Sequence, residues 1–132
     1  MRGVTVDQAG RTPLHYAALE GRVDDLQRMI ADGADVGAAD TALMTPLHMA
    51  CQQGQTGAAA ALIDAGAPVN ALDAHGNGPL WRAVFAFKQG GPQLVRLLLD
   101  AGADADAVNN AGSSPRNLAQ RMVGTDADAL FG

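Results

Sequence analysis

The chain has 132 residues and a formal net charge of −5, with 9 Lys and Arg against 14 Asp and Glu. Proteins that bind DNA or RNA carry a basic patch that neutralises phosphates, so this balance argues against nucleic acid as the partner. Hydrophobic residues make up 48% and aromatic residues only 4%, so the core must be built from small and aliphatic side chains on closely packed elements.

The sequence also argues against membrane association and secretion. No apolar run approaches the roughly 18 residues of a spanning helix, and the first ten residues lack the apolar core of a signal peptide. The single cysteine, Cys51, cannot form an internal disulfide and fits a reducing compartment. We therefore expect a cytoplasmic protein with no membrane partner.

The chain repeats itself along its length. Thr-Pro-Leu-His begins at Thr12 and at Thr45, Gly-Pro-Leu-Trp begins at Gly78, and Ser-Pro-Arg-Asn begins at Ser114. The first two intervals (45 − 12 and 78 − 45) are 33 residues, and the third (114 − 78) is 36. We interpret residues 1–132 as a single domain with units at about 7–39, 40–72, 73–108 and 109–132, the last one truncated.

Each full unit predicts two short helices in chain order. Thr12 and Thr45 precede a proline, and a hydroxyl cap followed by proline at the first helical position favours a helix start. Helices this short are marginal alone, so their stability must come from stacking on neighbouring units. The first helices should end at Gly21, Gly54 and Gly90, and the second helices should span 24–31, 57–64 and 93–100.

The period and the Thr-Pro-Leu-His-x-Ala signature resemble those of ankyrin repeats. The signature is complete at 12–17 and 45–50, and the resemblance covers about residues 7–124. It implies an all-α repeat solenoid, an ankyrin-like stack of helix-turn-helix units joined by β-hairpin-like fingers, with three full units and a truncated C-terminal cap. Arg116 and Asn117 replace the Leu-His of the signature in the last unit, where polar side chains would face water.

The second finger departs from this pattern at Leu43. Gly10 and Gly76 occupy the same position in the first and third fingers. Because a positive φ is costly for Leu, we expect this turn to change shape. The Leu43 side chain either packs against a neighbouring finger or forms an exposed apolar tip for a partner.

The third unit departs most. Trp81 replaces the signature His, and it either packs between the helix layers or contributes to an interface. We expect the three extra residues to lengthen the first helix of this unit by nearly a turn, with Phe87 then packing inward or lying at the interface. Phe85 and Lys88 accompany the insertion, and aromatic side chains contribute strongly to binding. Both are candidate contact residues.

His15 and His48 do not indicate catalysis, because each occupies the same place in its own unit. The resemblance implies that they form hydrogen bonds between neighbouring turns. The Cys and His spacings match no zinc site, and no phosphate-binding loop or nucleophile elbow is present. Cys51 is expected to be a small buried filler. We expect no enzyme activity, no cofactor and no metal ion.

The resemblance implies that partners bind a concave face made from the fingers and the first helices. Residues after the opening Asp, before Thr-Pro and at the end of the first helix would make the contacts, and they mix polar and apolar side chains as protein-recognition surfaces do. With the departures of the second and third units added, the candidate partner-binding residues are Arg11, Glu20, Thr41, Leu43, Met44, Gln52, Gln53, His75, Asn77, Arg82, Phe85, Lys88 and Asn110.

We therefore expect a non-catalytic protein-binding module that is a monomer by itself. Residues 79–84 and 114–119, together with the insertion, resemble short bacterial ankyrin proteins of the toxin-immunity kind. That resemblance implies an immunity protein that neutralises a toxin, and a basic toxin domain would be attracted by this acidic chain. A regulatory adaptor or inhibitor of a cellular enzyme is the alternative, and a metabolite- or metal-dependent enzyme or sensor is a third hypothesis.

Overall fold

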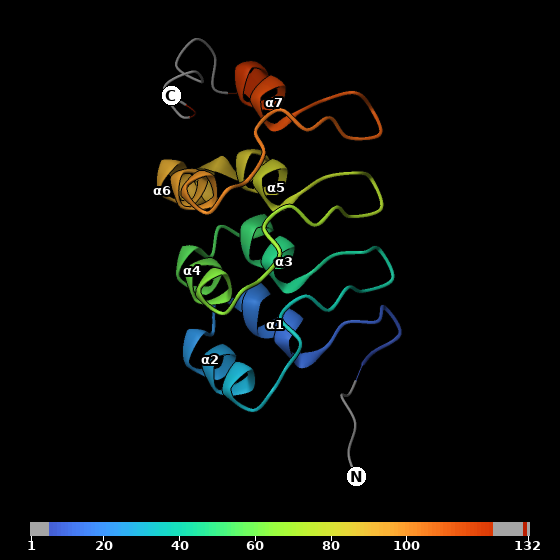
Figure 1. The fold of residues 1–132 in the computed structure, drawn as a ribbon, viewed down its shortest axis with the longest axis vertical. Coiled ribbons are helices and arrows are strands. Elements are labelled where there is room, and N and C mark those ends of the chain that lie inside the picture. The colour runs from blue at the N-terminus through green and yellow to red at the C-terminus, as the bar shows by residue number, and fades with distance from the viewer. Residues whose placement is uncertain (1–5, 123–130, 132) are drawn as a thin grey trace.

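The computed structural model describes residues 6–122 and residue 131. Helices α1, α3, α5 and α7 stack in one layer beside the projecting loops, and α2, α4 and α6 form a second layer (Figure 1). The described residues include no strand. The predicted all-α repeat solenoid is confirmed, with helices α1 (Pro13–Glu20), α2 (Val23–Ala31), α3 (Pro46–Gln52), α4 (Thr56–Asp64), α5 (Pro79–Phe85), α6 (Phe87–Asp100) and α7 (Pro115–Met122).

Helices α1 and α3 begin at the signals that predicted them. The hydroxyl oxygens of Thr12 and Thr45 accept from the backbone N–H groups of His15 and His48, and a proline occupies the first turn of each helix. The start of α5 has no side-chain cap, because Gly78 replaces the threonine. The local sequence therefore fixes where the first helices begin, most firmly in the first two units.

The three extra residues of the third unit do not lengthen α5, so that expectation is wrong. Helix α5 ends at Phe85, and the chain turns at Ala86 before α6 begins. Inside α6, Gly91 has φ 63° and ψ −167°, which separates a short helical turn over 87–90 from the main helix. Pro92 follows and opens the main helix. Proline lacks an N–H group, and a residue in the first turn of a helix has no acceptor within the helix for one. Gly76 and Gly102 of this unit also have positive φ, but neither lies within a helix.

The helical turn over 87–90 packs against the second unit. Gly54 has φ 68°, and a Cβ atom on it would lie 2.4 Å from Cβ of Gln89 and 2.6 Å from the backbone N of Gly90. Only glycine permits both this backbone conformation and this close approach. Phe87 is partly buried and packs against the core, which favours the inward alternative.

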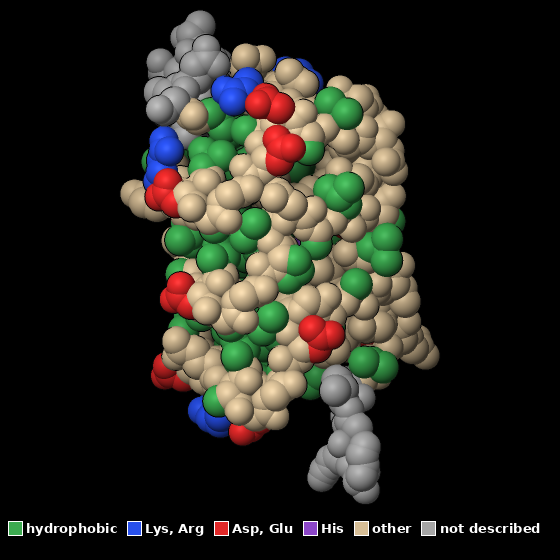
Figure 2. Space-filling model, viewed as in Figure 1, with side chains coloured by type: hydrophobic (Ala, Val, Ile, Leu, Met, Phe, Trp, Pro, Cys, Tyr) green, Lys and Arg blue, Asp and Glu red, His purple; other side chains and the backbone are tan. Residues whose placement is uncertain are grey.

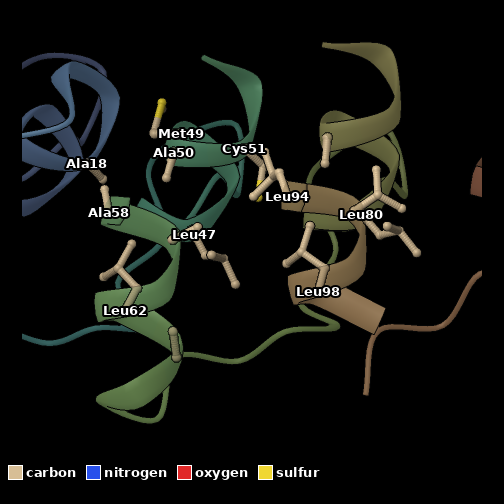
Figure 3. Close-up of a cluster of buried hydrophobic side chains, with 14 of the residues drawn as sticks. Ala18, Leu47, Met49, Ala50, Cys51, Ala58, Leu62, Leu80, Leu94 and Leu98 are labelled. Atoms are coloured by element: carbon tan, nitrogen blue, oxygen red, sulfur yellow. The ribbon is translucent and has the colours of Figure 1, made fainter. Parts of the chain in front are cut away.

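Equivalent aliphatic side chains of successive units form one continuous core (Figure 3). Leu47 and Leu80 come from first helices, Leu62 and Leu98 from second helices, and each is 2% exposed or less. Short helices remain folded here because each pair buries its leucines against the next. Cys51 is fully buried among these side chains, as expected for a small filler, and burial raises the pKa of its thiol.

Polar groups occupy the C-terminal end of the stack, as expected for residues 116 and 117. The hydroxyl oxygen of Ser114 accepts from the backbone N–H of Asn117 at 3.1 Å, and Oδ1 of Asn117 accepts from the N–H of Ser114 at 3.2 Å. Arg116 pairs with Asp106 at 2.8 Å. Residues 123–130 and 132 of the expected fourth unit lie outside the described residues. Among the helices described, none has the length and apolar character required to cross a bilayer.

Candidate functional site

The turns that precede the first helices project as four fingers: finger 1 (7–12), finger 2 (40–45), finger 3 (73–78) and finger 4 (109–114) (Figure 1). In finger 2, Oδ1 of Asp40 accepts from the backbone N–H groups of Ala42 and Met44 at 2.9 and 2.8 Å. Asp7, Asp73 and Asn109 make the same pair of bonds in their own fingers. These side chains hold the shape of each fingertip.

His15 and His48 join each first helix to the finger of the next unit. Nε2 of His15 lies 2.8 Å from the carbonyl oxygen of Met44, and Nε2 of His48 lies 2.8 Å from that of Asn77. Nδ1 of each ring accepts from the backbone N–H of the capping threonine, so Nε2 carries the hydrogen and donates. The predicted structural role of both histidines is confirmed. The described residues contain no group of three or more side chains that could hold a metal ion.

This link is missing in the third unit, where Trp81 replaces the histidine. Nε1 of Trp81 is buried and has no acceptor among the described residues. Nδ2 of Asn109 instead donates to Oδ1 of Asn77 at 2.8 Å and joins fingers 3 and 4. The N–H of Asn110 also donates to the carbonyl of His75, a bond that the other neighbouring fingers make too. The indole therefore retains an unused hydrogen-bond donor.

Trp81, Arg82 and Phe85 form an aromatic cluster on α5. The rings of Trp81 and Phe85 stack with centroids 5.5 Å apart and planes 11° from parallel, and Cζ of Arg82 lies 5.9 Å from the Trp81 ring centroid. Phe85 is 59% exposed. Trp81 is half-buried and packs against the core, which favours the first of its alternatives, and its contribution to an interface stays a prediction.

Asp73 holds Arg82 in place. Nη2 of Arg82 donates to Oδ2 of Asp73 at 2.6 Å, and the carboxylate is almost completely buried. Burial raises the pKa of Asp73, but the ion pair with Arg82 and two backbone N–H groups outweigh it and hold the pKa below its usual range. Sequence analysis missed this pair and the Asn109–Asn77 bond. The recurring Asp or Asn that opens each finger was visible, but its partners depend on tertiary structure.

Leu43 adopts the left-handed backbone conformation, with φ 62°. Its N–H donates to the carbonyl of Asp40 at 2.9 Å, just as that of Gly10 donates to Asp7 in finger 1. The expected change of turn shape is therefore wrong, because the bonds from Asp40 hold the backbone despite the side chain. Leu43 is 51% exposed, which favours the alternative of an exposed apolar tip.

Most of the candidate partner-binding residues reach the surface, but two do not. Met44 and Asn77 are each 6% exposed and cannot offer contact area. The Met44 side chain packs in the core, and Asn77 is bound to Asn109. The remaining candidates are exposed (Glu20, Thr41, Leu43, Gln53, His75, Phe85, Lys88 and Asn110) or half-buried (Arg11, Gln52 and Arg82).

Charge is distributed unequally between the two sides of the stack. On the face drawn in Figure 2, acidic side chains lie along the edge formed by the second helices and at a few places nearer the middle, and none is seen at the right-hand edge. Carboxylates within the fingers are engaged: Asp40 is buried beside Arg11, and Asp73 beside Arg82. Asp7 of finger 1 is exposed and accepts from the hydroxyl of Tyr16. Fingers 2–4 therefore present neutral polar and apolar groups.

Comparison with known protein families agrees with this architecture. A model described as ankyrin repeats (3 copies) matches residues 26–109, more than half of the chain, and a model of one ankyrin repeat matches residues 9–41. A search of curated proteins gave no match. Ankyrin repeats are protein–protein interaction modules, and this chain belongs to the ankyrin repeat family.

Proposed function

We propose that the chain binds another protein through a recognition face, defined as the exposed tips of fingers 1–4 and the C-terminal ends of α1, α3 and α5. Leu43 carries the proposal. A left-handed conformation costs a residue with a Cβ atom about 1 kcal/mol relative to glycine, and the half-exposed side chain gains little from the core. Contact with a partner would offset this cost.

The aromatic cluster supports the same face. Phe85 is one of only three Phe in the chain, yet it lies 59% exposed at the end of α5. Exposed aromatic side chains near Arg are the composition that dominates binding energy at interfaces. The fingers are held by repeated hydrogen bonds, so little conformational entropy is lost on binding.

The partner that we propose is a toxin, which this chain would neutralise as a cytoplasmic immunity protein without catalysing a reaction. The resemblance of residues 79–84 and 114–119 to immunity-type ankyrin proteins supports this role. The net charge of −5 would attract a basic toxin domain over long range. The chain itself would be a monomer before it binds.

Affinity capture from the native cell tests the proposal, with the wild-type chain and Phe85→Asp as parallel baits. A charge-matched control is Gln27→Asp, on the exposed surface of α2. We expect one partner that the wild type and the Gln27 variant retain and the Phe85 variant loses. A partner retained equally by all three contradicts the recognition face.

Growth then separates the two functional hypotheses. If the captured protein is a toxin, cells that produce it should stop growing and should recover when this chain is co-expressed. A captured cellular enzyme that is harmless when produced alone would instead support the regulatory adaptor.

A further inference from the structure

A pocket of about 420 Å3 opens between fingers 3 and 4 at the aromatic cluster. Trp81, Arg82 and Phe85 line it from α5, and His75 and Asn110 line it from the two fingers. We propose that this pocket takes a carboxylate side chain, Asp or Glu, from the protein partner. The inference rests on the proposed function, because the pocket lies within the recognition face.

Two donors of the residues that line the pocket have no acceptor among the described residues. Nε1 of Trp81 has no acceptor within the described chain. Arg82 donates from Nε and Nη2 to Asp73 at 3.1 and 2.6 Å, and among the described residues its Nη1 meets no acceptor. Oδ1 of Asp73 is already occupied by the backbone N–H groups of His75 and Asn77. The nearest carboxylate is therefore saturated and does not compete for the free donors.

The first two units have no such pair of donors. At the position of Trp81 they carry His15 and His48, whose Nε2 atoms already donate to carbonyl oxygens. At the position of Arg82 they carry Tyr16 and Met49, neither of which bears a cation. The site therefore arises from the departures of the third unit.

A carboxylate matches these groups better than a neutral acceptor does. One of its oxygens can accept from the free guanidinium N–H, and charge-assisted bonds are about twice as strong as neutral ones. The other can accept from the indole N–H once the Trp81 ring turns to bring this buried group into the pocket. A buried donor without a partner destabilises the free protein, so an acceptor that satisfies Nε1 of Trp81 gains affinity from that source too. The exposed ring of Phe85 offers apolar surface to the methylene groups of the same side chain.

Selection from a display library of random dodecapeptides on the full chain tests this proposal. We expect the selected peptides to share an Asp or Glu beside an apolar residue. Titration calorimetry should show that replacing this acid with its amide weakens binding by about tenfold or more. Because Trp81 is the only Trp in the chain, its fluorescence should change on binding of the acidic peptide.

Two variants locate the contact. Trp81→Phe removes the unused N–H while retaining an aromatic ring. Arg82→Lys removes Nη1 but retains the charge and one donor for Asp73, where Arg82 has two. Each variant should bind the acidic peptide several-fold more weakly than the wild type, with a melting temperature within a few degrees of the wild-type value. The control Arg28→Lys on α2, where Arg28 is 68% exposed, should bind the peptide as the wild type does. The proposal is overturned if no acidic peptide is selected, or if both pocket variants bind the peptide as the wild type does.

The same variants distinguish this inference from the proposed function. If Phe85→Asp abolishes binding of the captured partner while Trp81→Phe and Arg82→Lys leave it unchanged, the recognition face stands and the carboxylate pocket falls. If all three variants bind normally, both proposals fail.

Discussion

Nε2 of His48 donates to the carbonyl oxygen of Asn77, 2.8 Å away, across the boundary between the second and third units. Nδ1 of the same ring accepts from the N–H of Thr45 at 3.2 Å, so the neutral ring uses both nitrogens inside the core. A proton added to Nδ1 would remove that acceptor and place a charge in a buried site. This bond therefore ties the stacking of units to the protonation state of one imidazole.

Stability should fall as the solution is acidified through the histidine range. Burial lowers the pKa of His48 in the folded chain, while in the unfolded chain it stays near its usual value of about 6.5. Below that pH the unfolded state binds a proton that the folded state does not, so the free energy of unfolding decreases. Urea unfolding should be measured at about pH 7.5 and about pH 5.5. The difference in the free energy of unfolding between the wild type and His48→Gln should be smaller at the lower pH. A difference in the free energy of unfolding that is the same at both pH values would contradict a lowered pKa of His48 in the folded chain.

Thr45→Ala should destabilise the chain by about 0.5–2 kcal/mol. The hydroxyl of Thr45 is buried, caps α3 and lies 2.9 Å from Nδ1 of His48, so the substitution removes two interactions of one side chain. Thr45→Ser, which retains the hydroxyl, should recover most of the loss. Equal unfolding midpoints in denaturant for the wild type and the Ala variant would show that the cap contributes nothing.

Leu43→Gly should raise the free energy of unfolding by about 1 kcal/mol, because glycine adopts the positive φ of this turn without steric cost. The same substitution should weaken binding of the partner. Leu43→Ala separates the two effects, since it removes most of the apolar side chain but keeps a Cβ atom in the left-handed conformation. It should weaken binding without stabilising the fold, and a stabilisation as large as that of the Gly variant would show that the backbone is not strained.

Gly54→Ala should destabilise the chain more than Gly66→Ala does. Both glycines have positive φ, but a Cβ on Gly54 would meet Gln89 at 2.4 Å, whereas a Cβ on Gly66 meets nothing within 4 Å. The difference between the two variants in thermal or urea unfolding isolates the packing of the insertion against the second unit. Equal losses would mean that the helical turn over 87–90 is not held against Gly54.

The repeat predicted the helices and their order, because a 33-residue period with capped proline starts leaves little freedom in the first two units. The insertion was misread because residues 90–92 read as a simple helix end, whereas Gly91 and Pro92 restart a helix that already has a turn before it. Nothing in the sequence indicates that Gly54 lies against the helical turn over 87–90.

The surface was predicted in outline and missed in detail. Met44 and Asn77 share the position directly before the residue that precedes the helix-opening proline in the second and third units. A family pattern alone places both on the binding face. Their burial depends on the neighbouring finger and on the histidine bonds that their carbonyls accept. The unused donor of Trp81 likewise follows from tertiary contacts that the substitution of His by Trp does not reveal alone.

Hydrogen–deuterium exchange of this chain, with and without its captured partner, tests the central claim most directly. We predict that binding slows exchange in fingers 2–4 and at the end of α5, where Leu43, His75 and Phe85 lie exposed. Exchange in α2, α4 and the main part of α6 should change little. Protection confined to those second helices, with the fingers unchanged, would contradict the recognition face.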